Sequence, residues 1–476
     1  MKNLTKFNYA EIEKIFSDCK LFNFDNEWEA IGVSTDSRTL ETKNIFVAIL
    51  GEKFDGHNSI DEAFLRGTSA VVISYNWFIS NRKIIDNKIP VIVVNDTVEA
   101  LGKLANFHRN RFNYPIIVVG GSNGKTTTKD IIASVLGVKY QVLKTFKSYN
   151  NRIGVPLMLF QLSENYNMAV LEIGTSIPSE IEMLTKIIDP TDGLITNIGL
   201  EHLELLIDLD GVEIEETYLF SYLDKKGGRC FVNMDDERLQ KYESIISNHI
   251  TFGTEGAEYT IKVEFDSGLN PILFFSNGAT EKLTMVRLNA TGIAVAYNSI
   301  AAVSVGYGFD LTTLEIAKGL SNFKSDSSDS FARMVVENYK HLYILNDCYN
   351  ANPSSMELSL QTLHMFNLSN YKIATLGDMV ELGINSHQEH IKTIKYALQL
   401  ADEVVVIGQN MQKAAYEIID ENNKVNLKIF NNYYEIATYF RMFDVKSIGF
   451  IATLIKGSRK MEMEILIQML RTSNAL

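Results

Sequence analysis

Residues 115–130 read PIIVVGGSNGKTTTKD, in which an apolar, β-branched run leads through a glycine-rich turn into a helical segment. The glycines of the turn are Gly120, Gly121 and Gly124. Glycine lets backbone N–H groups approach a phosphate closely, and the start of the following helix favours anions. Lys125 would then reach the terminal phosphates, and the Thr126 hydroxyl a magnesium ion. Val119 occupies the first glycine position of G-x-x-x-x-G-K-T, so the stretch predicts a phosphate-binding loop of the shorter form G-x-x-G-K-T.

The same alternation of short apolar strands and helices extends outward from this loop. MAVLEIG at 168–174 and GLITNIG at 193–199 are each followed by a helical segment. Strands that alternate with helices at this spacing imply a parallel sheet wrapped by helices. The other expected strands are NIFVAIL, SAVVIS and IPVIVVND near the N-terminus, and HLYILND, YKIATLGD, DEVVVIGQN and SIGFIATLIKGS near the C-terminus. The predicted fold class is therefore α/β.

Three domains in series are expected. At 476 residues the chain is too long for one ordinary hydrophobic core. Residues 1–112 predict a smaller α/β unit, residues 113–327 the parallel-sheet domain with the phosphate loop, and residues 328–476 a compact Rossmann-like domain. The polar loop FKSDSSDS, at 323–330, is typical of a domain junction.

Composition argues against several classes of function. The net charge of −13 argues against a broad surface for nucleic acid or for an acidic membrane. The N-terminal residues lack the apolar core of a signal peptide, and no apolar run approaches the length of a membrane span, so we expect a cytoplasmic protein. The three cysteines lie far apart, which fits neither a disulfide framework nor a metal-binding knuckle.

Polar side chains lie at or after the ends of two expected strands in the domain that carries the phosphate loop. Glu172 ends the strand MAVLEI, and His202 follows the strand GLITNIG. Because the carboxyl ends of parallel strands face the same crevice, both side chains can meet a metal beside the phosphates. Asn150 and Asn151 lie in a loop before another expected helix, where they can bind a polar substrate group. These residues predict a crevice for a nucleotide and a metal ion, which a kinase, a motor or a ligase would share.

Longer motifs occur in all three expected domains. The first carries STDSRTLETKNIFVAILGEKFDGHNSIDEAFLRGTSAVVI, the central one GGSNGKTTTKD, NNRIGVP, LEIG and TNIGLEHLE, and the last NDCYNANPSSM, LGDMVELG and LIKGSRKMEME. Over nearly its whole length the chain therefore resembles the Mur ligases of peptidoglycan synthesis. The C-terminal motifs resemble the branch of that family that adds D-alanyl-D-alanine to UDP-N-acetylmuramoyl-tripeptide.

The resemblance implies a three-domain, ATP-dependent ligase that makes an amide bond from a carboxylate and an amine. In this family the carboxylate is first phosphorylated, so that a poor leaving group becomes a good one, and ADP and phosphate are released. The implied cofactors are ATP and Mg²⁺. The metal ion would offset the charge of the transferring phosphoryl group. The implied partners are a UDP-sugar peptide and a dipeptide or other amine, without nucleic acid, and we expect a monomer.

The resemblance also assigns roles to individual residues. The loop residues expected to hold the nucleotide are Gly121, Ser122, Asn123, Gly124, Lys125, Thr126 and Thr127. Further nucleotide contacts are expected from Asn298, Arg333, Asp347 and Asn350. The expected catalytic residues are Lys125, His202, Glu216, Arg333 and Lys456, and the expected magnesium ligands are Thr126, Glu172, His202 and Glu216. The residues expected to bind the substrates are Ser37, Arg38, Asp55, His57, Asn150, Asn151, Lys456 and Arg459.

Glu216 departs from the family pattern. In the family, a lysine after the histidine motif reacts with carbon dioxide, and its carbamate helps to hold a second magnesium ion; the matching residue here is Glu216. It follows Val212 by four residues and precedes Phe220 by four, which puts it on the apolar, inward stripe of a helix. Its carboxylate keeps the negative charge but reaches roughly 3.5 Å less far. Glu213 and Glu215 fall off that stripe, and we expect them to be solvated.

Other positions near the expected crevice also depart from the family pattern. Ala294 and Val295 replace a polar pair that would meet the nucleotide, Arg152 stands where an acid is usual, and Ala332 replaces the glycine before Arg333. One alternative is therefore a paralogue that joins a different amine to a different carboxylate on a nucleotide-linked sugar. The other is a catalytically weak scaffold subunit that binds nucleotide. A phosphotransferase is less favoured, because the C-terminal motifs are those of an amine-adding ligase.

Overall fold

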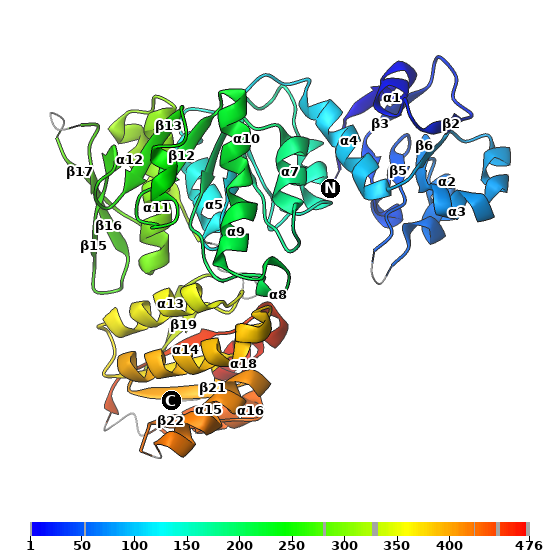
Figure 1. Cartoon of the computed structure of the whole chain (residues 1–476). Coiled ribbons are helices and arrows are strands. Elements are labelled where there is room, and N and C mark those ends of the chain that lie inside the picture. The colour runs from blue at the N-terminus through cyan, green and yellow to red at the C-terminus, as the bar shows by residue number, and fades with distance from the viewer. Residues whose placement is uncertain are drawn as a thin grey trace. The chain divides into compact units, whose positions relative to one another are not determined.

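The computed structural model describes residues 2–51, 54–278, 282–325, 332–422, 424–443 and 448–472. The chain divides into two compact units. The first unit contains Met1–Val118, Gln141–Gly174 and Ser179–Thr191, and the second contains Val119–Tyr140, Thr175–Pro178 and Asp192–Leu476. The boundary between them falls within one strand, β8 (Ile116–Gly120), and Figure 1 labels the elements that precede and follow it.

A five-stranded sheet forms the N-terminal part of the first unit. Its strands, in spatial order, are β2 (Lys20–Phe22), β7 (Val91–Val94), β6 (Ala70–Ser74), β5 (Ile45–Val47) and β4 (Val33–Ser34). Neighbouring strands are parallel except β2 and β7. Both β5 and β7 are buried along their whole length, as expected for strands in a covered parallel sheet. The remaining elements here are β1 (Lys6–Asn8), α1 (Tyr9–Ile15), β3 (Glu29–Ile31), η1 (Ser37–Thr39), η2 (Gly56–Ser59), α2 (Ile60–Leu65), α3 (Tyr75–Ser80), η3 (Arg82–Asn87) and α4 (Thr97–Arg109).

The rest of the first unit surrounds the beginning of β8. Its other elements are β9 (Val142–Lys144), α6 (Gly154–Leu159), β10 (Met168–Glu172) and α7 (Glu180–Ile188). Strands β9 and β10 pair in parallel. The end of α4 is fixed to the end of α7, because Arg109 donates to the carbonyl oxygens of Ile188 at 2.8 Å and Asp189 at 2.7 Å. These bonds satisfy carbonyls at the end of α7 that have no partner within the helix.

Four parallel strands form the sheet of the second unit that follows the phosphate turn. In order they are β11 (Asp192–Ile195), β12 (Arg229–Asn233), β13 (His249–Gly253) and β14 (Tyr259–Thr260). The helices of this part are α5 (Lys125–Leu136), α8 (Leu203–Leu206), α9 (Leu209–Glu216), α10 (Tyr218–Lys226), η4 (Gln240–Glu243), α11 (Ile293–Gly308) and α12 (Thr313–Asn322). A separate antiparallel sheet consists of β15 (Lys262–Phe265), β16 (Pro271–Phe275) and β17 (Thr284–Arg287). Helix α5, which begins at the phosphate turn, packs against α11 and α12.

A six-stranded sheet forms the C-terminal part of the second unit. Its order is β18 (Val335–Tyr339), β19 (Leu342–Asn346), β23 (Ile451–Lys456), β20 (Tyr371–Gly377), β21 (Glu403–Ile407) and β22 (Leu427–Ile429). Only the edge pair β18–β19 is antiparallel. One apolar core joins the sheet to α13 (Pro353–Met365), α14 (Ser386–Leu400) and α15 (Gln409–Glu421), and a second joins it to α16 (Tyr433–Phe440) and α18 (Glu464–Thr472). Two short 3₁₀ helices are η6 (Gly383–Asn385) and η7 (Arg459–Met461). Helices on both faces make this part Rossmann-like, as predicted.

The α/β class and the parallel sheets agree with the prediction, and each strand expected from the sequence has a counterpart. The expected junction at residues 327 and 328 lies outside the described residues, and the three-domain boundaries stay a prediction. None of the helices in the described part of the chain is long and apolar enough to span a membrane.

Candidate functional site

The glycine-rich turn lies between β8 and α5, as the sequence predicts. Gly121 and Gly124 have φ angles of +107° and +82°, which L side chains rarely adopt. A Cβ atom on Gly121 would lie 2.4 Å from Thr196 Oγ1, and a Cβ atom on Gly124 would lie 2.4 Å from Asn298 Oδ1. Both glycines are therefore required by backbone conformation and by close packing. Asn298, a predicted nucleotide contact, lies directly against the turn.

Three backbone N–H groups of the turn have partners within the second unit. Gly121 N–H donates to Glu216 Oε2 at 2.7 Å. Ser122 N–H donates to the backbone oxygen of Asn197 at 2.9 Å, and Asn123 N–H donates to its side-chain oxygen at 3.1 Å. The N–H groups in the first turn of α5 have no carbonyl partner within the helix. The start of α5 is therefore the part of the loop that can cradle a phosphate.

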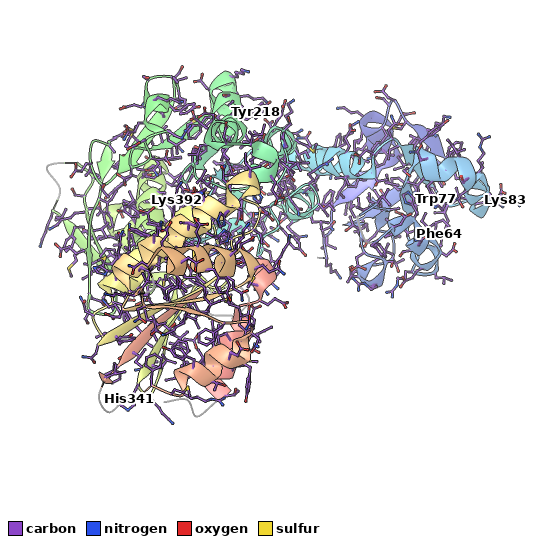
Figure 2. The ribbon with its side chains drawn as sticks, turned by 60° about the horizontal axis from the view of Figure 1, so that its bottom comes forward. Phe64, Trp77, Lys83, Tyr218, His341 and Lys392 are labelled. Atoms are coloured by element: carbon purple, nitrogen blue, oxygen red, sulfur yellow. The ribbon has the colours of Figure 1, made fainter. Side chains whose placement is uncertain are left out.

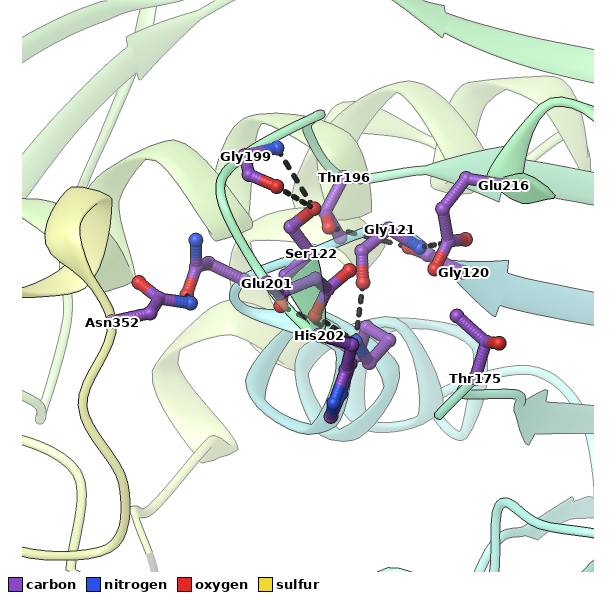
Figure 3. Close-up of polar contacts among 12 residues, drawn as sticks. Gly120, Gly121, Ser122, Thr175, Thr196, Gly199, Glu201, His202, Glu216 and Asn352 are labelled. Carbon is purple, nitrogen blue, oxygen red and sulfur yellow. Dashed lines mark hydrogen bonds and ion pairs between the residues drawn. The ribbon is translucent and has the colours of Figure 1, made fainter. Parts of the chain in front are cut away.

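The Lys125 ammonium lies against the turn itself. It donates to the backbone oxygens of Gly121 and Ser122. It also lies 3.6 Å from Glu201 Oε2, and the Glu201 side chain is only 8% exposed. Lysine has a flexible four-carbon stem, so the ammonium can turn from these partners to a phosphate. The structure thus places the predicted catalytic lysine between backbone carbonyls and the buried carboxylate of Glu201, which Figure 3 labels together with Gly121 and Ser122.

Glu216 is fully buried, as its helical spacing predicts. Its Oε2 accepts the bond from Gly121, whereas Oε1 is buried and has no hydrogen-bond partner among the described residues. Burial raises the pKa of Glu216 to about 7, while Lys125 lowers this pKa and Glu201 raises it. A buried carboxylate oxygen without a partner costs free energy. Such an oxygen beside a phosphate turn is typical of a functional site.

His202 is paired with a residue from the C-terminal motif LGDMVELG. Its Nδ1 lies 2.7 Å from Glu381 Oε2. Burial lowers the pKa of His202, but the hydrogen bond with Glu381 and the charge of Glu201 outweigh burial, so the pKa is raised. The same hydrogen bond lowers the pKa of Glu381. With Nδ1 bound to a carboxylate, Nε2 is the ring nitrogen that can face a metal.

Two further residues of the C-terminal segment contact the phosphate turn. Arg333 Nη2 donates to Thr126 Oγ1 at 3.2 Å. The Arg333 guanidinium also lies 3.9 Å from the centroid of the Tyr349 ring, in a cation–π contact. Asn352, labelled in Figure 3, donates from Nδ2 to Asn123 Oδ1 at 2.8 Å. The structure therefore brings together Arg333 and Thr126, which the sequence predicts to share the nucleotide site.

Lys456 and Asp347 form a buried ion pair at the carboxyl ends of β23 and β19. Lys456 Nζ lies 2.6 Å from Asp347 Oδ2, which also accepts from Ser359 Oγ at 2.6 Å. Lys456 donates to the backbone oxygen of Asn350 at 3.0 Å, and Arg459 N–H donates to Asn350 Oδ1 at 3.3 Å. Buried charges persist when they are paired and hydrogen-bonded in this way. These four predicted residues therefore form one cluster: Asp347, Asn350, Lys456 and Arg459.

The predicted residues after β9 and β10 lie in the first unit. Glu172 is buried, and its Oε1 accepts from Asn150 Nδ2 at 2.8 Å. Asn151 Oδ1 accepts from the backbone N–H groups at the start of α6, with the bond to Gly154 at 2.9 Å. Arg152, a departure from the family pattern, lies 3.8 Å from a carboxylate oxygen of Asp96. Asn150 and Glu172 are therefore hydrogen-bonded to each other, whereas Asn151 binds backbone N–H groups at the start of α6.

Two residues that are predicted to bind the UDP-sugar, Ser37 and Arg38, lie in η1 of the first unit. Ser37 is buried and donates to Glu62 Oε2 at 2.6 Å. Arg38 donates two bonds to the carboxylate of Asp36, at 2.9 and 2.8 Å, and its side chain is 81% exposed. Of the two, Arg38 is therefore the side chain that a ligand can reach from solvent.

His57 of the motif DGH is held on both ring nitrogens. Asp55 Oδ1 accepts from His57 N–H at 3.0 Å and lies 2.6 Å from His57 Nδ1. His57 Nε2 accepts from Ser74 N–H at 3.0 Å. The ring stacks on Trp77 of α3, labelled in Figure 2, at a centroid distance of 5.3 Å. These contacts give Asp55 and His57 a structural role, and their contact with a substrate stays a prediction.

The carboxylates beside the phosphate turn fit a magnesium ion. No group of three or more His, Cys, Asp or Glu side chains is placed to hold a metal within the residues that the structure describes. However, Glu201 Oε1 and Glu216 Oε1 are both buried without a hydrogen-bond partner in the described part of the chain. Magnesium is usually bound by one or two carboxylates, together with waters and substrate phosphates. Two orphaned carboxylate oxygens beside a phosphate loop match that mode of binding.

Two acids of α9 differ from the prediction. Glu213 and Glu215 are 7% and 8% exposed, so they are buried rather than solvated. Glu213 accepts from Arg238 at 2.9 Å and from Tyr242 at 3.2 Å, and Glu215 accepts from Thr175 at 3.4 Å. The segment after β12 supplies the two donors to Glu213, and the segment after β10 supplies the donor to Glu215. Helical spacing alone does not show which distant segment will cover a helix.

Several residues at the turn are not among those predicted from the sequence. They are Thr196, Asn197, Glu201, Asn352 and Glu381. All five lie within motifs that the sequence singles out, namely TNIGLEHLE, NDCYNANPSSM and LGDMVELG. The motifs therefore locate the site, but the partner of each side chain appears only in the fold.

Three sequence profiles match the chain in order. The profile of the Mur ligase family, catalytic domain, matches residues 30–109. The profile of the Mur ligase middle domain matches residues 119–306, which contain the phosphate turn. The profile of the Mur ligase, glutamate ligase domain, matches residues 332–453, which contain Arg333 and Asp347. Together these matches include most of the candidate site.

Individual proteins agree with these profiles. The UDP-N-acetylmuramoyl-tripeptide–D-alanyl-D-alanine ligase of Bacillus subtilis is 34% identical over 372 residues, which is 74% of either chain. The crystal structure of MurF from Acinetobacter baumannii has a TM-score of 0.86 at 26% identity, and the match covers 98% of this chain and 99% of that one. The MurF ligase of Thermotoga maritima in complex with ADP has a TM-score of 0.78 at 26% identity, and covers 92% and 96%.

Proposed function

The chain belongs to the Mur ligase family, and from this membership we propose that it joins D-alanyl-D-alanine to UDP-N-acetylmuramoyl-tripeptide. The bond formed is an amide between the carboxylate of the tripeptide and the amine of the dipeptide. ATP drives the reaction through an acyl phosphate and is converted to ADP and phosphate. The protein is thus an ATP-dependent carboxylate–amine ligase.

The contact between the phosphate turn and the C-terminal segment carries this proposal. Arg333 donates to Thr126, and Asn352 donates to Asn123, so C-terminal residues lie at the nucleotide end of the site. A ligase must present its amine where the phosphorylated carboxylate forms, and a second segment at the turn supports that arrangement. Nucleotide binding alone would not need this segment.

The residues of the second unit suit each step of the reaction. The first-turn N–H groups of α5 would hold the phosphates, and Lys125 and Arg333 would offset the charge that develops on the transferring phosphoryl group. Phosphate is then a good leaving group when the amine attacks the acyl carbon. Lys456, the last residue of β23, and Arg459, the first residue of η7, would bind the carboxylate of the incoming dipeptide.

Magnesium is part of the proposal. The residues of the second unit that would hold the ion are Thr126, His202 and Glu216, and the orphaned Oε1 of Glu216 supports this assignment. When bound, the ion would neutralise phosphate charge and orient the phosphates. The role of Glu172 as a magnesium ligand stays a prediction.

Binding of the UDP-sugar by the first unit also stays a prediction. The residues concerned are Ser37, Arg38, Asp55 and His57, and the binding of a polar substrate group by Asn150 and Asn151 stays a prediction too. Of these, the exposed Arg38 guanidinium has the chemistry to pair with a diphosphate. The monomeric state and the cytoplasmic location are expectations of the same kind.

Phosphate release in the presence of chosen substrates tests the proposed reaction. With ATP, Mg²⁺ and UDP-N-acetylmuramoyl-tripeptide, the protein should release phosphate only after D-alanyl-D-alanine is added. Lys125→Met should lower the rate at least about 100-fold, because the charge on the phosphoryl group loses its main side-chain partner. Lys139→Met, which removes an exposed lysine beyond the end of α5, should leave the rate unchanged.

Two results would overturn the proposed substrates. Release with another amine but not with D-alanyl-D-alanine would show a paralogue with a different specificity. Nucleotide binding without release for any pair of acid and amine would show a scaffold subunit.

A further inference from the structure

Lys125, Glu201 and Glu216 form one buried charged group beside the phosphate turn. Lys125 Nζ lies 3.6 Å from Glu201 Oε2 and donates to the backbone oxygen of Gly121. The N–H of the same Gly121 donates to Glu216 Oε2 at 2.7 Å. Lys125 and Glu201 shift the pKa of Glu216 in opposite directions, so the three charges interact. When both carboxylates are ionised, the single ammonium leaves one negative charge unbalanced within this group.

The contacts with Lys125 and Gly121 involve only one oxygen, Oε2, of each carboxylate. Glu201 Oε1 and Glu216 Oε1 are buried and accept no hydrogen bond from any residue that the structure describes, and the two residues are 7% and 0% exposed. In Figure 3 the two carboxylates lie on either side of Gly121. These acceptor oxygens are buried, and the negative charge of their group exceeds its positive charge. That combination has the chemistry of a cation site.

We propose that Lys125 is the internal counter-ion of Glu201 and Glu216 while no nucleotide is bound, and that a divalent cation replaces it when it turns to the phosphates. The carbonyl oxygens of Gly121 and Ser122 that now accept from Lys125 are uncharged, so a phosphate is a stronger partner for the ammonium. The exchange balances charge on both sides, because a divalent cation matches two carboxylates and the lysine matches a phosphate. Glu201, which the family resemblance gives no role, thereby becomes a cation ligand.

Mn²⁺ binding to the full chain without nucleotide tests this exchange, with free Mn²⁺ measured by electron paramagnetic resonance. Lys125→Met should bind Mn²⁺ at least about tenfold more tightly than the unsubstituted protein, because the competing charge is gone. Adding Glu201→Gln or Glu216→Gln to that variant should abolish the gain. Lys139→Met removes a charge from an exposed position and should not change Mn²⁺ affinity.

Lys125→Arg supplies the decisive comparison, because it keeps the charge at the same position. It should bind Mn²⁺ as weakly as the unsubstituted protein, and binding as tight as that of Lys125→Met would overturn the proposal. Equal affinity of Lys125→Met and the unsubstituted protein would overturn it as well. Lys125→Ala replaces the methionine variant if circular dichroism shows that the latter is unfolded. The inference rests on the proposed use of Mg²⁺ with ATP, but no substrate is present in this test, so its outcome is separate from that of the phosphate-release assay.

Discussion

Glu216 is a residue whose burial should lower the stability of the protein at neutral and alkaline pH. Burial raises its pKa from 4.5 to about 7. The folded state therefore holds this proton more tightly than the unfolded state. As pH rises from about 4.5 towards 7, the unfolded chain ionises first, and the free energy of unfolding falls. The loss is complete once the folded carboxyl has also ionised.

Replacing Glu216 with glutamine should reverse this loss. The amide oxygen of Glu216→Gln can still accept from Gly121 N–H but carries no charge. At pH 8 the variant should be more stable than the unsubstituted protein by about 1–3 kcal/mol, and at pH 5 the difference should be small. Urea unfolding at the two pH values measures both. Glu204→Gln, on the exposed side of α8, is the control, and an equal gain there or a destabilised Glu216→Gln would contradict the explanation.

Sequence spacing predicts the roles of some residues at the phosphate turn but not of others. The positions of Gly121, Gly124 and Lys125 follow from the loop pattern, because a phosphate cradle requires those residue types in that order. The inward phase of Glu216 follows from helical periodicity. Glu201 follows from neither, since its role depends on the approach of Lys125, which only the folded chain provides.

Helix α9 shows why a buried acid can be misassigned from its helical phase. Periodicity predicts the side that faces the sheet, but α9 is covered on its other side as well, by the segment after β12. The small antiparallel sheet of β15, β16 and β17 is missed for a related reason. Residues in β15 alternate between exposed and half-buried, so this strand lacks the continuous apolar run that identifies the parallel strands.

The anchoring of α9 by Glu213 gives a prediction about the stability of this helix and about nucleotide binding. Glu213 accepts from Arg238 and Tyr242, and its side chain is only 10% exposed. Glu213→Gln should lower the free energy of unfolding by about 1–3 kcal/mol, because a mostly buried charge pair is broken. It should also weaken ADP binding, since Glu216 on the same helix holds the phosphate turn. Urea unfolding and calorimetric titration with ADP measure the two effects.

Asp210 provides a matched control for this prediction. It pairs with the same Arg238 at 2.7 Å, but its side chain is 78% exposed. Asp210→Asn should therefore change stability by less than about 1 kcal/mol and leave ADP affinity unchanged. If both variants lost the same stability, burial of Glu213 would not be what anchors the helix.

The second unit as a whole is held together at the phosphate turn by contacts that no local pattern predicts. The sequence indicates the parallel sheets because each strand carries its own apolar signal. The pairs Arg333–Thr126, Asn352–Asn123 and His202–Glu381 join segments far apart in the chain. Their partners depend on how the elements pack, so local periodicity cannot identify them, although the motifs name most of the residues.

Because of these contacts, we expect nucleotide binding to protect backbone amides of the C-terminal segment from hydrogen exchange. Adding ADP and Mg²⁺ should slow amide hydrogen exchange in residues 121–127 and also in residues 349–356, because Asn352 ties the start of α13 to the turn. Strand β21, at the far side of the C-terminal sheet, should not change. Asn352→Ala should keep the protection of residues 121–127 and lose that of residues 349–356. Equal protection of both segments in this variant would mean that ADP reaches the C-terminal segment by a route other than the Asn352–Asn123 bond.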